Sequence, residues 1–324
     1  MNKIILLILL IFIASNSYGE SLKLHFAGFA FMGNSENVEK NYPVSYKLSQ
    51  EKDQNGLCKI QDELRKKVLA IKSERFTITT DLGDLNSGSA VSFAFAIDWE
   101  NVSIEQISDI RKIVIDLHGQ ILAFDFKEKK IIAAFPVAVQ LIHSEQCAGY
   151  SKARWSSEPL IRKMFYDGDY VNIFDELVKK LSQIEMKEKY GHRIKVIDVV
   201  FDDEALKSIE EQNINLPTAK VFIAGNFAKY LSTNQGISVL PYTVGQAIGG
   251  KMAARFANGE VYNLEIPVPD YNVILTVRKF QKAEFDRTSA EIGFVYGSYF
   301  NIKVVQPELN KVYMDARLRG TLTK

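Results

Sequence analysis

The chain has 324 residues, 47% of them hydrophobic, which is enough apolar material for a large core and exceeds the usual size of one domain. Its 40 Lys and Arg residues nearly balance its 39 Asp and Glu residues, leaving a formal net charge of +1. Because a nucleic-acid binder needs an excess of basic residues, this balance argues against that class of partner.

The first 19 residues have the layout of a secretory signal peptide. Lys3 supplies a positive charge, residues 4–14 are uninterruptedly apolar, and small residues follow at Ser17 and Gly19. We therefore expect residues 1–19 to be removed on export, leaving a periplasmic or secreted protein; a buried N-terminal strand or helix is the alternative. The apolar run is too short to span a bilayer, and no later run is longer, so we expect no transmembrane span.

Residues 20–150 are predicted to form a first α/β domain. Apolar residues at helical spacing predict a helix over residues 57–71, after a loop over residues 33–56. Ser103 and Gln106 form a capping box, which predicts a second helix from there to Gly119. Strands are predicted over residues 22–31, 75–80, 90–99, 120–126 and 131–142, the last two joined as a hairpin by the charged turn 127–130.

Residues 151–168 are predicted to be a linker, and residues 169–324 a second α/β domain. Helices are predicted over residues 169–190, 203–212, 226–231 and 244–257. Strands are predicted over residues 193–201, 219–223, 237–242, 261–266, 271–280, 291–305 and 311–318. Each half runs from helices and strands into an antiparallel hairpin or meander. The sequence therefore predicts an α/β (α+β) fold of two mixed-sheet domains. The shared order suggests a duplicated module, with the second domain a diverged repeat of the first, although the residues themselves show no repeat.

Two cysteines, Cys58 and Cys147, are an even number in a compartment expected to be oxidising. We predict a disulfide between them, with two separate thiols as the alternative. A bridge over such a loop would contribute roughly 4–5 kcal/mol in the chain-entropy treatment.

One segment resembles a phosphate-binding loop. Residues 245–251 (GQAIGGK) follow a predicted strand and open a predicted helix, but Met252 stands where a magnesium-binding Ser or Thr is needed. Close packing of the helix through Gly249 and Gly250 explains the glycines without a nucleotide. We therefore predict no nucleotide and no other cofactor.

Other candidates for chemistry have simpler explanations. The carboxylates Asp198, Asp202, Asp203 and Glu204 lack the spacing of a calcium loop, and Asp202 or Asp203 can cap a helix. The histidines are far apart in sequence: His25, His118, His143 and His192. No Gly-x-Ser-x-Gly motif is present. We predict neither a metal site nor catalytic residues, although a site assembled only in space would escape this reasoning.

Aromatic residues gather in the last predicted strands, and Tyr296, Tyr299 and Tyr313 are our candidates for a binding surface for sugar or protein. Packing of a sheet against helices is the alternative explanation. Arg317 and Arg319 alternate with apolar positions, so we expect them to face water.

The second half also carries three segments in a recognisable order. They are residues 226–241 (with NFAKYL and GISVLP), residues 270–278 (DYNVILTVR), and the pair 299–305 and 311–315. Over roughly residues 194–319 this order resembles the amino-terminal domain of TolB and its relatives among curli-assembly lipoproteins, penicillin-binding-protein activators and flagellar assembly proteins. The sequence departs from the family in lacking a glycine after the Asp-Tyr strand and Thr-Gly in the last turn. The resemblance implies a non-catalytic accessory part in an envelope assembly.

Three functions are therefore compared. The first is a periplasmic accessory or structural protein that binds other envelope proteins through sheet edges and loops, alone or as an oligomer. The second is a small-molecule or glycan-binding module. The third is a hydrolase whose site is not visible in the sequence. We expect the first.

Overall fold

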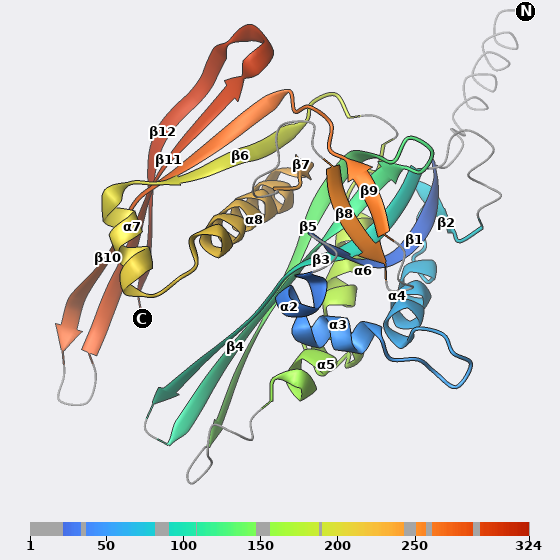
Figure 1. Cartoon of the computed structure of the whole chain (residues 1–324), viewed down its shortest axis with the longest axis horizontal. Coiled ribbons are helices and arrows are strands. Elements are labelled where there is room, and N and C mark those ends of the chain that lie inside the picture. The colour runs from blue at the N-terminus through green and yellow to red at the C-terminus, as the bar shows by residue number, and fades with distance from the viewer. Residues whose placement is uncertain are drawn as a thin grey trace, which may run out of the picture.

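A computed structural model shows a mixed α/β protein built on two mixed β-sheets, which confirms the predicted fold class (Figure 1). The residues that it describes are 22–33, 37–81, 91–107, 109–146, 156–187, 190–242, 251–256, 261–287 and 292–323. The predicted signal peptide, residues 1–19, lies outside them.

The first sheet has seven strands in the order β2-β1-β3-β4-β5-β9-β8. Their bounds are β1 Leu22–Met32, β2 Phe76–Thr79, β3 Val91–Ile107, β4 Ile110–Asp125, β5 Lys130–Gln146, β8 Lys251–Phe256 and β9 Val261–Glu265. Strand β8 also pairs with β1, so the strands close into a ring. β1 and β3 pair in parallel and are apolar on both faces, as central parallel strands must be.

Helices cover one face of this sheet with a large aromatic core. They are α2 Val38–Asn41, α3 Pro43–Ser49, α4 Lys59–Leu69, α5 Glu158–Tyr166 and α6 Ile173–Gln183. Phe29 and Phe95 from the sheet pack edge-on against Phe174 of α6, and all three are fully buried. The other face carries small residues such as Ala30, Ala94 and Ala134, which leaves room for the β8–β9 hairpin.

The second sheet has five strands in the order β12-β11-β10-β6-β7. Their bounds are β6 Ile194–Phe201, β7 Val239–Leu240, β10 Tyr271–Arg287, β11 Ile292–Gln306 and β12 Lys311–Thr323. Two helices, α7 Asp203–Glu211 and α8 Leu216–Gln235, pack on one face. The 3₁₀ turn Pro307–Leu309 with left-handed Asn310 joins β11 to β12, so the predicted closing hairpin is confirmed.

The two sheets share one strand order. In the first, β2-β1-β3 are parallel and β3-β4-β5 antiparallel; in the second, β7-β6-β10 are parallel and β10-β11-β12 antiparallel. This match supports the hypothesis of a diverged repeat. The predicted division at residues 151–168 stays a prediction, and segments cross it: α5, α6 and the β8–β9 hairpin all pack with the first sheet.

The helix predicted from Ser103 to Gly119 is wrong, because this stretch forms the end of β3 and most of β4. Its apolar residues fit helical spacing, but Ile113, Ile115 and Leu117 are buried while the residues between them are more exposed. That alternation is the period of a strand, and β-branched residues favour it. The loop predicted over residues 33–56 is also wrong in part, since Pro43 begins α3 at a position where proline suits a helix.

Two further assignments need correction. The strand predicted over residues 219–223 and the helix over 226–231 form one helix, α8, which Asn215 caps by accepting a hydrogen bond from the Thr218 N–H. A short apolar run such as 221–224 cannot be told from a helix segment by periodicity alone. The helix predicted over residues 244–257 is instead strand β8 over Lys251–Phe256, and the glycine-rich residues 245–250 lie outside the described part.

Candidate protein-binding surface

Strands β10, β11 and β12 continue well past the rest of the second sheet as a three-stranded ribbon. Strand β6 pairs with β10 only from Tyr271 to Val277, whereas β11 follows β10 as far as Arg287. In Figure 1 this ribbon extends beyond α7 at the left of the molecule. Both faces of the ribbon are therefore open to solvent over the part that the helices do not cover.

One face of the ribbon is apolar and only partly covered. Phe300, Ile302 and Val304 of β11 pack against the core beneath α7 and α8. By strand alternation and cross-strand pairing, the charged Lys282 and Glu284 share this face with six large apolar side chains: Phe280, Phe294, Tyr296, Met314, Leu318 and Leu322. Phe280, Leu318 and Leu322 are 38%, 48% and 65% exposed. We call these six residues the apolar face.

A lysine lies between two rings of the apolar face. Lys282 Nζ is 3.9 Å from the ring centre of Phe294 and 5.5 Å from that of Tyr296. These cation–π contacts hold the two rings beside each other although both remain partly accessible. The apolar face thus presents ordered aromatic surface.

The opposite face is basic. Tyr299 lies over Gly297, where a Cβ atom would come within 3.3 Å of the ring, and Lys279 Nζ is 4.9 Å from the ring centre. Arg319 is the cross-strand partner of Tyr299, and Arg317 and Lys303 lie on the same face by pairing. Arg317 and Arg319 are exposed, as their alternation with apolar residues predicts. We call Lys279, Tyr299, Lys303, Arg317 and Arg319 the basic face.

Strand β12 is the outer edge of the sheet. Among the strands that the structure describes, only β11 pairs with it. Over residues 311–322, where exposure is described, every residue except Ala316 is exposed. A long edge strand with one open side is a template for pairing with another chain.

The three predicted tyrosines lie on this ribbon but do not form one surface. Tyr296 belongs to the apolar face and Tyr299 to the basic face, because an odd spacing along a regular strand reverses the side. Tyr313 lies near the turn, and its ring is edge-on to that of Tyr271 with 5.6 Å between the ring centres. Its hydroxyl donates a hydrogen bond to Gln306 Oε1 at 3.0 Å. Leu318 and Leu322 were not predicted as surface residues, because their alternation with Arg317 and Arg319 indicates a buried side for them.

The candidates for chemistry are separated in the structure. Asp198 accepts a hydrogen bond from Lys220 at 2.9 Å, and Asp202 precedes α7 without a side-chain capping bond. Ser92 Oγ is 3.4 Å from His25 Nδ1, but both side chains are buried, so the pair has no access to a substrate. Within the described part of the chain, no three His, Cys, Asp or Glu side chains form a metal-binding group.

The predicted disulfide is not tested by the structure. Cys58 has a free thiol that donates to the Ser49 carbonyl at 3.2 Å, and Cys147 lies outside the described residues. The bridge between Cys58 and Cys147 stays a prediction.

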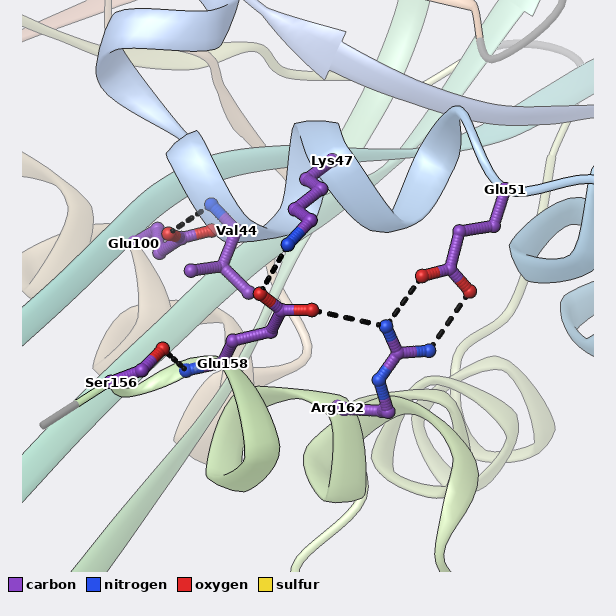
Figure 2. A network of polar contacts seen from close by, with 7 residues as sticks. All are labelled: Val44, Lys47, Glu51, Glu100, Ser156, Glu158 and Arg162. Atoms are coloured by element: carbon purple, nitrogen blue, oxygen red, sulfur yellow. Dashed lines mark hydrogen bonds and ion pairs between the residues drawn. The ribbon is translucent and has the colours of Figure 1, made fainter. Parts of the chain in front are cut away.

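A polar network ties α3 to α5 on the first sheet (Figure 2). Arg162 donates to both carboxylate oxygens of Glu51, at 2.8 and 2.5 Å, and to Glu158, which also binds Lys47. These contacts lower the pKa values of Glu51 and Glu158 and raise that of Arg162. Each charged side chain of this network is paired with an oppositely charged side chain of the same chain. We therefore interpret the network as a contact that positions α3 against α5, and not as a ligand-binding site.

A carboxylate of β3 anchors the start of α3. Glu100 accepts hydrogen bonds from the backbone N–H groups of Val44 and Ser45, at 3.0 and 2.8 Å. A negative charge at a helix N-terminus satisfies donors that the helix cannot. Burial still raises the pKa of Glu100, which marks it as a structural group enclosed under α3.

Two titratable groups are largely, though not fully, enclosed on the other face of the first sheet. Burial raises the pKa of Asp98 to about 6, although Gln120 donates a hydrogen bond to it at 2.6 Å. The ring of His118 lies against Trp99 of β3 and Phe222 of α8. Burial, together with the positive charge of nearby Lys229, lowers the pKa of His118 to about 4. Both shifts come mainly from burial under packed elements, so they report on the structure of the first sheet.

Within the described ranges, no helix combines the length and the apolar character needed to cross a bilayer.

Comparison with known proteins gives little beyond this geometry. No family model and no curated protein matches the chain, so the TolB-type resemblance stays a prediction. Among solved structures, a Helicobacter pylori protein described as a neuraminyllactose-binding hemagglutinin homolog aligns with 43% of this chain and 67% of its own, at 11% identity and a TM-score of 0.22.

Two further solved structures align with half of the chain. A minor lipoprotein from Acinetobacter baumannii covers 50% of this chain and 87% of its own, at 10% identity and a TM-score of 0.24. A hypothetical protein from Chlamydia trachomatis covers 50% and 96%, at 9% identity and a TM-score of 0.22. TM-scores below 0.5 do not establish a shared fold, and function is therefore inferred from the geometry of this chain.

Proposed function

We propose that the chain is a non-catalytic accessory protein of a cell-envelope assembly that binds other envelope proteins through the apolar face of the β10–β12 ribbon. One observation carries the proposal: Phe280, Leu318 and Leu322 lie exposed together on one face of an ordered sheet. Contiguous exposed apolar surface is uncommon on proteins that act alone and marks sites of association.

The composition of the apolar face suits a protein partner. Interface centres are rich in aromatic residues and poor in charge, and this face offers Phe280, Phe294 and Tyr296 beside aliphatic side chains. Tyr296 and Tyr299 point to opposite sides of the ribbon, so these two predicted tyrosines do not form one glycan platform. The envelope location is supported by the signal-peptide pattern of residues 1–19.

Site-specific photocrosslinking in living cells tests the proposal. A benzophenone amino acid is placed at Leu322, which is 65% exposed on the apolar face, and as a matched control at Leu57, which is 56% exposed before α4. We expect a discrete crosslinked protein from position 322 and none from position 57. Equal crosslinking at both positions, or none at either, would remove the proposal.

A further inference from the structure

Strand β5 of the first sheet occupies the position that β12 occupies in the second, and the outer side of its first residues has partners within the chain. Lys130 of β5 pairs with Glu265 of β9, whose N–H donates to the Lys129 carbonyl at 2.7 Å. Farther along, Ser238 Oγ accepts from the Ala134 N–H at 3.0 Å and contacts the Ala134 carbonyl at 3.3 Å. Buried backbone groups require such partners.

Strand β12 has no equivalent cover among the residues that the structure describes. Its only strand neighbour there is β11, and the β8–β9 hairpin, which lies between β7 and β10 in the chain, has joined the first sheet instead. The first sheet thus gains pairing from β9 at the start of its β5 edge, whereas the β12 edge of the second sheet has no such partner among the described residues. A strand from outside could extend the second sheet beyond β12.

We propose that β12 accepts an extended segment of a partner protein as a further strand, and that this segment alternates acidic residues with apolar ones. The inference rests on the proposed function and specifies how the partner binds. Main-chain hydrogen bonds to a sheet edge supply affinity, and alternate side chains supply specificity.

The acidic residues are inferred from the basic face. On the two outermost strands this face carries Arg317, Arg319 and Lys303 against the single carboxylate of Asp315, which accepts a hydrogen bond from Asn301 at 2.9 Å. Side chains directly opposite on neighbouring strands lie about 5 Å apart. Alternate residues of an added strand would therefore stand beside Arg317 and Arg319, where acidic side chains pair and basic ones repel.

The apolar residues are inferred from the other side of the same edge. Leu318 and Leu322 are exposed on the apolar face, and Met314 lies in line with them. The intervening residues of an added strand would cover these three side chains. The two faces of β12 thus require a partner strand in which acidic and apolar residues alternate. A random coil or a purely charged tail does not meet this requirement.

A second copy of this chain fits the edge less well. Pairing of β12 with itself would place Arg317 and Arg319 of both copies on one face, with only Asp315 from each copy to oppose them. Like charges in adjacent positions of a sheet are destabilising. The charge of this face therefore favours a different, acidic chain.

The test uses the full chain lacking residues 1–19 and a fluorescein-labelled twelve-residue peptide that alternates Glu with Ile, Val and Thr. We expect binding by fluorescence anisotropy, with slowed amide exchange confined to β12 and its neighbours. Reversal of two charges in Arg317→Glu/Arg319→Glu should weaken binding about tenfold, as expected for two cross-strand charge pairs. The same change in net charge at exposed Lys72 and Lys207, in Lys72→Glu/Lys207→Glu, should leave binding unchanged.

A matched peptide with Lys in place of Glu sharpens the result. We expect it to bind the wild-type chain weakly and the Arg317→Glu/Arg319→Glu variant more tightly. Equal binding of both peptides to the wild type, no protection of β12, or a dimer in sedimentation that the acidic peptide fails to dissociate would each overturn the inference. If photocrosslinking from Leu322 persists unchanged in the Arg317→Glu/Arg319→Glu variant, strand addition guided by charge is wrong while the proposed function stands.

Discussion

The two sheets are built in the same strand order, yet the first encloses most of its apolar residues, leaving Ile104, Ile110, Ile142 and Val261 exposed at strand ends, whereas the second leaves a row of them exposed along β10, β11 and β12. Helices α3 to α6 cover one face of the first sheet, and the β8–β9 hairpin closes the other. In the second sheet, α7 and α8 cover only the half nearest to β6. The difference teaches that one topology can serve as a closed core or as an open platform, depending on where its inserted segments pack.

The largest expected effect is the difference in the free energy of unfolding between a substitution in the enclosed core and one on the exposed apolar face. Phe29 is fully buried among Phe31, Phe95, Phe165 and Phe174, so Phe29→Ala should lower the free energy of unfolding by roughly 3–5 kcal/mol. Leu322→Ser on the apolar face should change it by less than about 0.5 kcal/mol. Urea unfolding monitored by circular dichroism measures both. A large loss for Leu322→Ser would mean that the apolar face belongs to the core.

The next effect concerns pH and the first sheet alone. His118 has its pKa lowered from 6.5 to about 4, so its stabilising contribution is present above pH 6.5 and is lost as pH falls through 4. Asp98 has its pKa raised from 3.8 to about 6, so its contribution is present below pH 3.8 and is lost as pH rises through 6. Each amounts to at most about 3 kcal/mol, and the two oppose each other between pH 4 and 6.

Single variants should therefore separate these opposing contributions. Asp98→Asn should make stability fall more steeply from pH 6 to 4, and His118→Gln should make it rise over that range. Urea midpoints measured at half-unit pH steps check both slopes. Parallel curves for the wild type and both variants would contradict the assignment of these shifts to burial in the first sheet.

A third effect tests the covered edge. Ser238→Ala removes the side chain that meets the Ala134 N–H and carbonyl on β5, and should cost about 1–3 kcal/mol, the price of unpaired buried groups. Hydrogen exchange at Ala134 should quicken at the same time. The control is Ser208→Ala in α7, where the Ser208 hydroxyl donates a hydrogen bond only to the Glu204 carbonyl of the same helix. Similar losses in both variants would show that β5 does not depend on this contact.

The smallest effect concerns ion pairs. Arg162→Gln breaks the bidentate contact with Glu51 between α3 and α5, and should cost about 1 kcal/mol, since both partners are partly exposed and screened by salt. Arg287→Gln breaks a similar pair with Glu284 at the open end of the ribbon and should leave the urea midpoint unchanged. A loss for Arg162→Gln that is unaffected by 0.5 M salt would argue against a screened ion pair.

Much of the fold could be predicted from local patterns. The hairpin β4–β5 follows from two apolar strands around the charged turn 127–130, where Asp125 accepts from the N–H groups of Lys127 and Glu128. The end of β3 and the start of β4 could not be predicted as securely, because their isoleucines satisfy helical and strand spacing together. Only pairing with distant residues decides between the two.

The surface was harder to predict than the fold. Tyr296, Tyr299 and Tyr313 were selected by residue type, although the odd spacing of the first two already indicates opposite sides of a strand. The alternation around Arg317 and Arg319 does predict that these two side chains face water. It cannot show that Leu318 and Leu322 are left uncovered, since that depends on how far α7 and α8 reach.

Helix α8 touches both sheets at once. It packs on β6 in the second sheet and on β5 in the first. The ring centres of Phe222 in α8 and Trp99 in β3 are 5.5 Å apart, and the Ser232 carbonyl of α8 accepts a hydrogen bond from Lys180 of α6. A helix shared in this way cannot be released by one half without uncovering the other. The two halves should consequently melt in a single calorimetric transition, and tension applied at the open ribbon would be transmitted to the enclosed half.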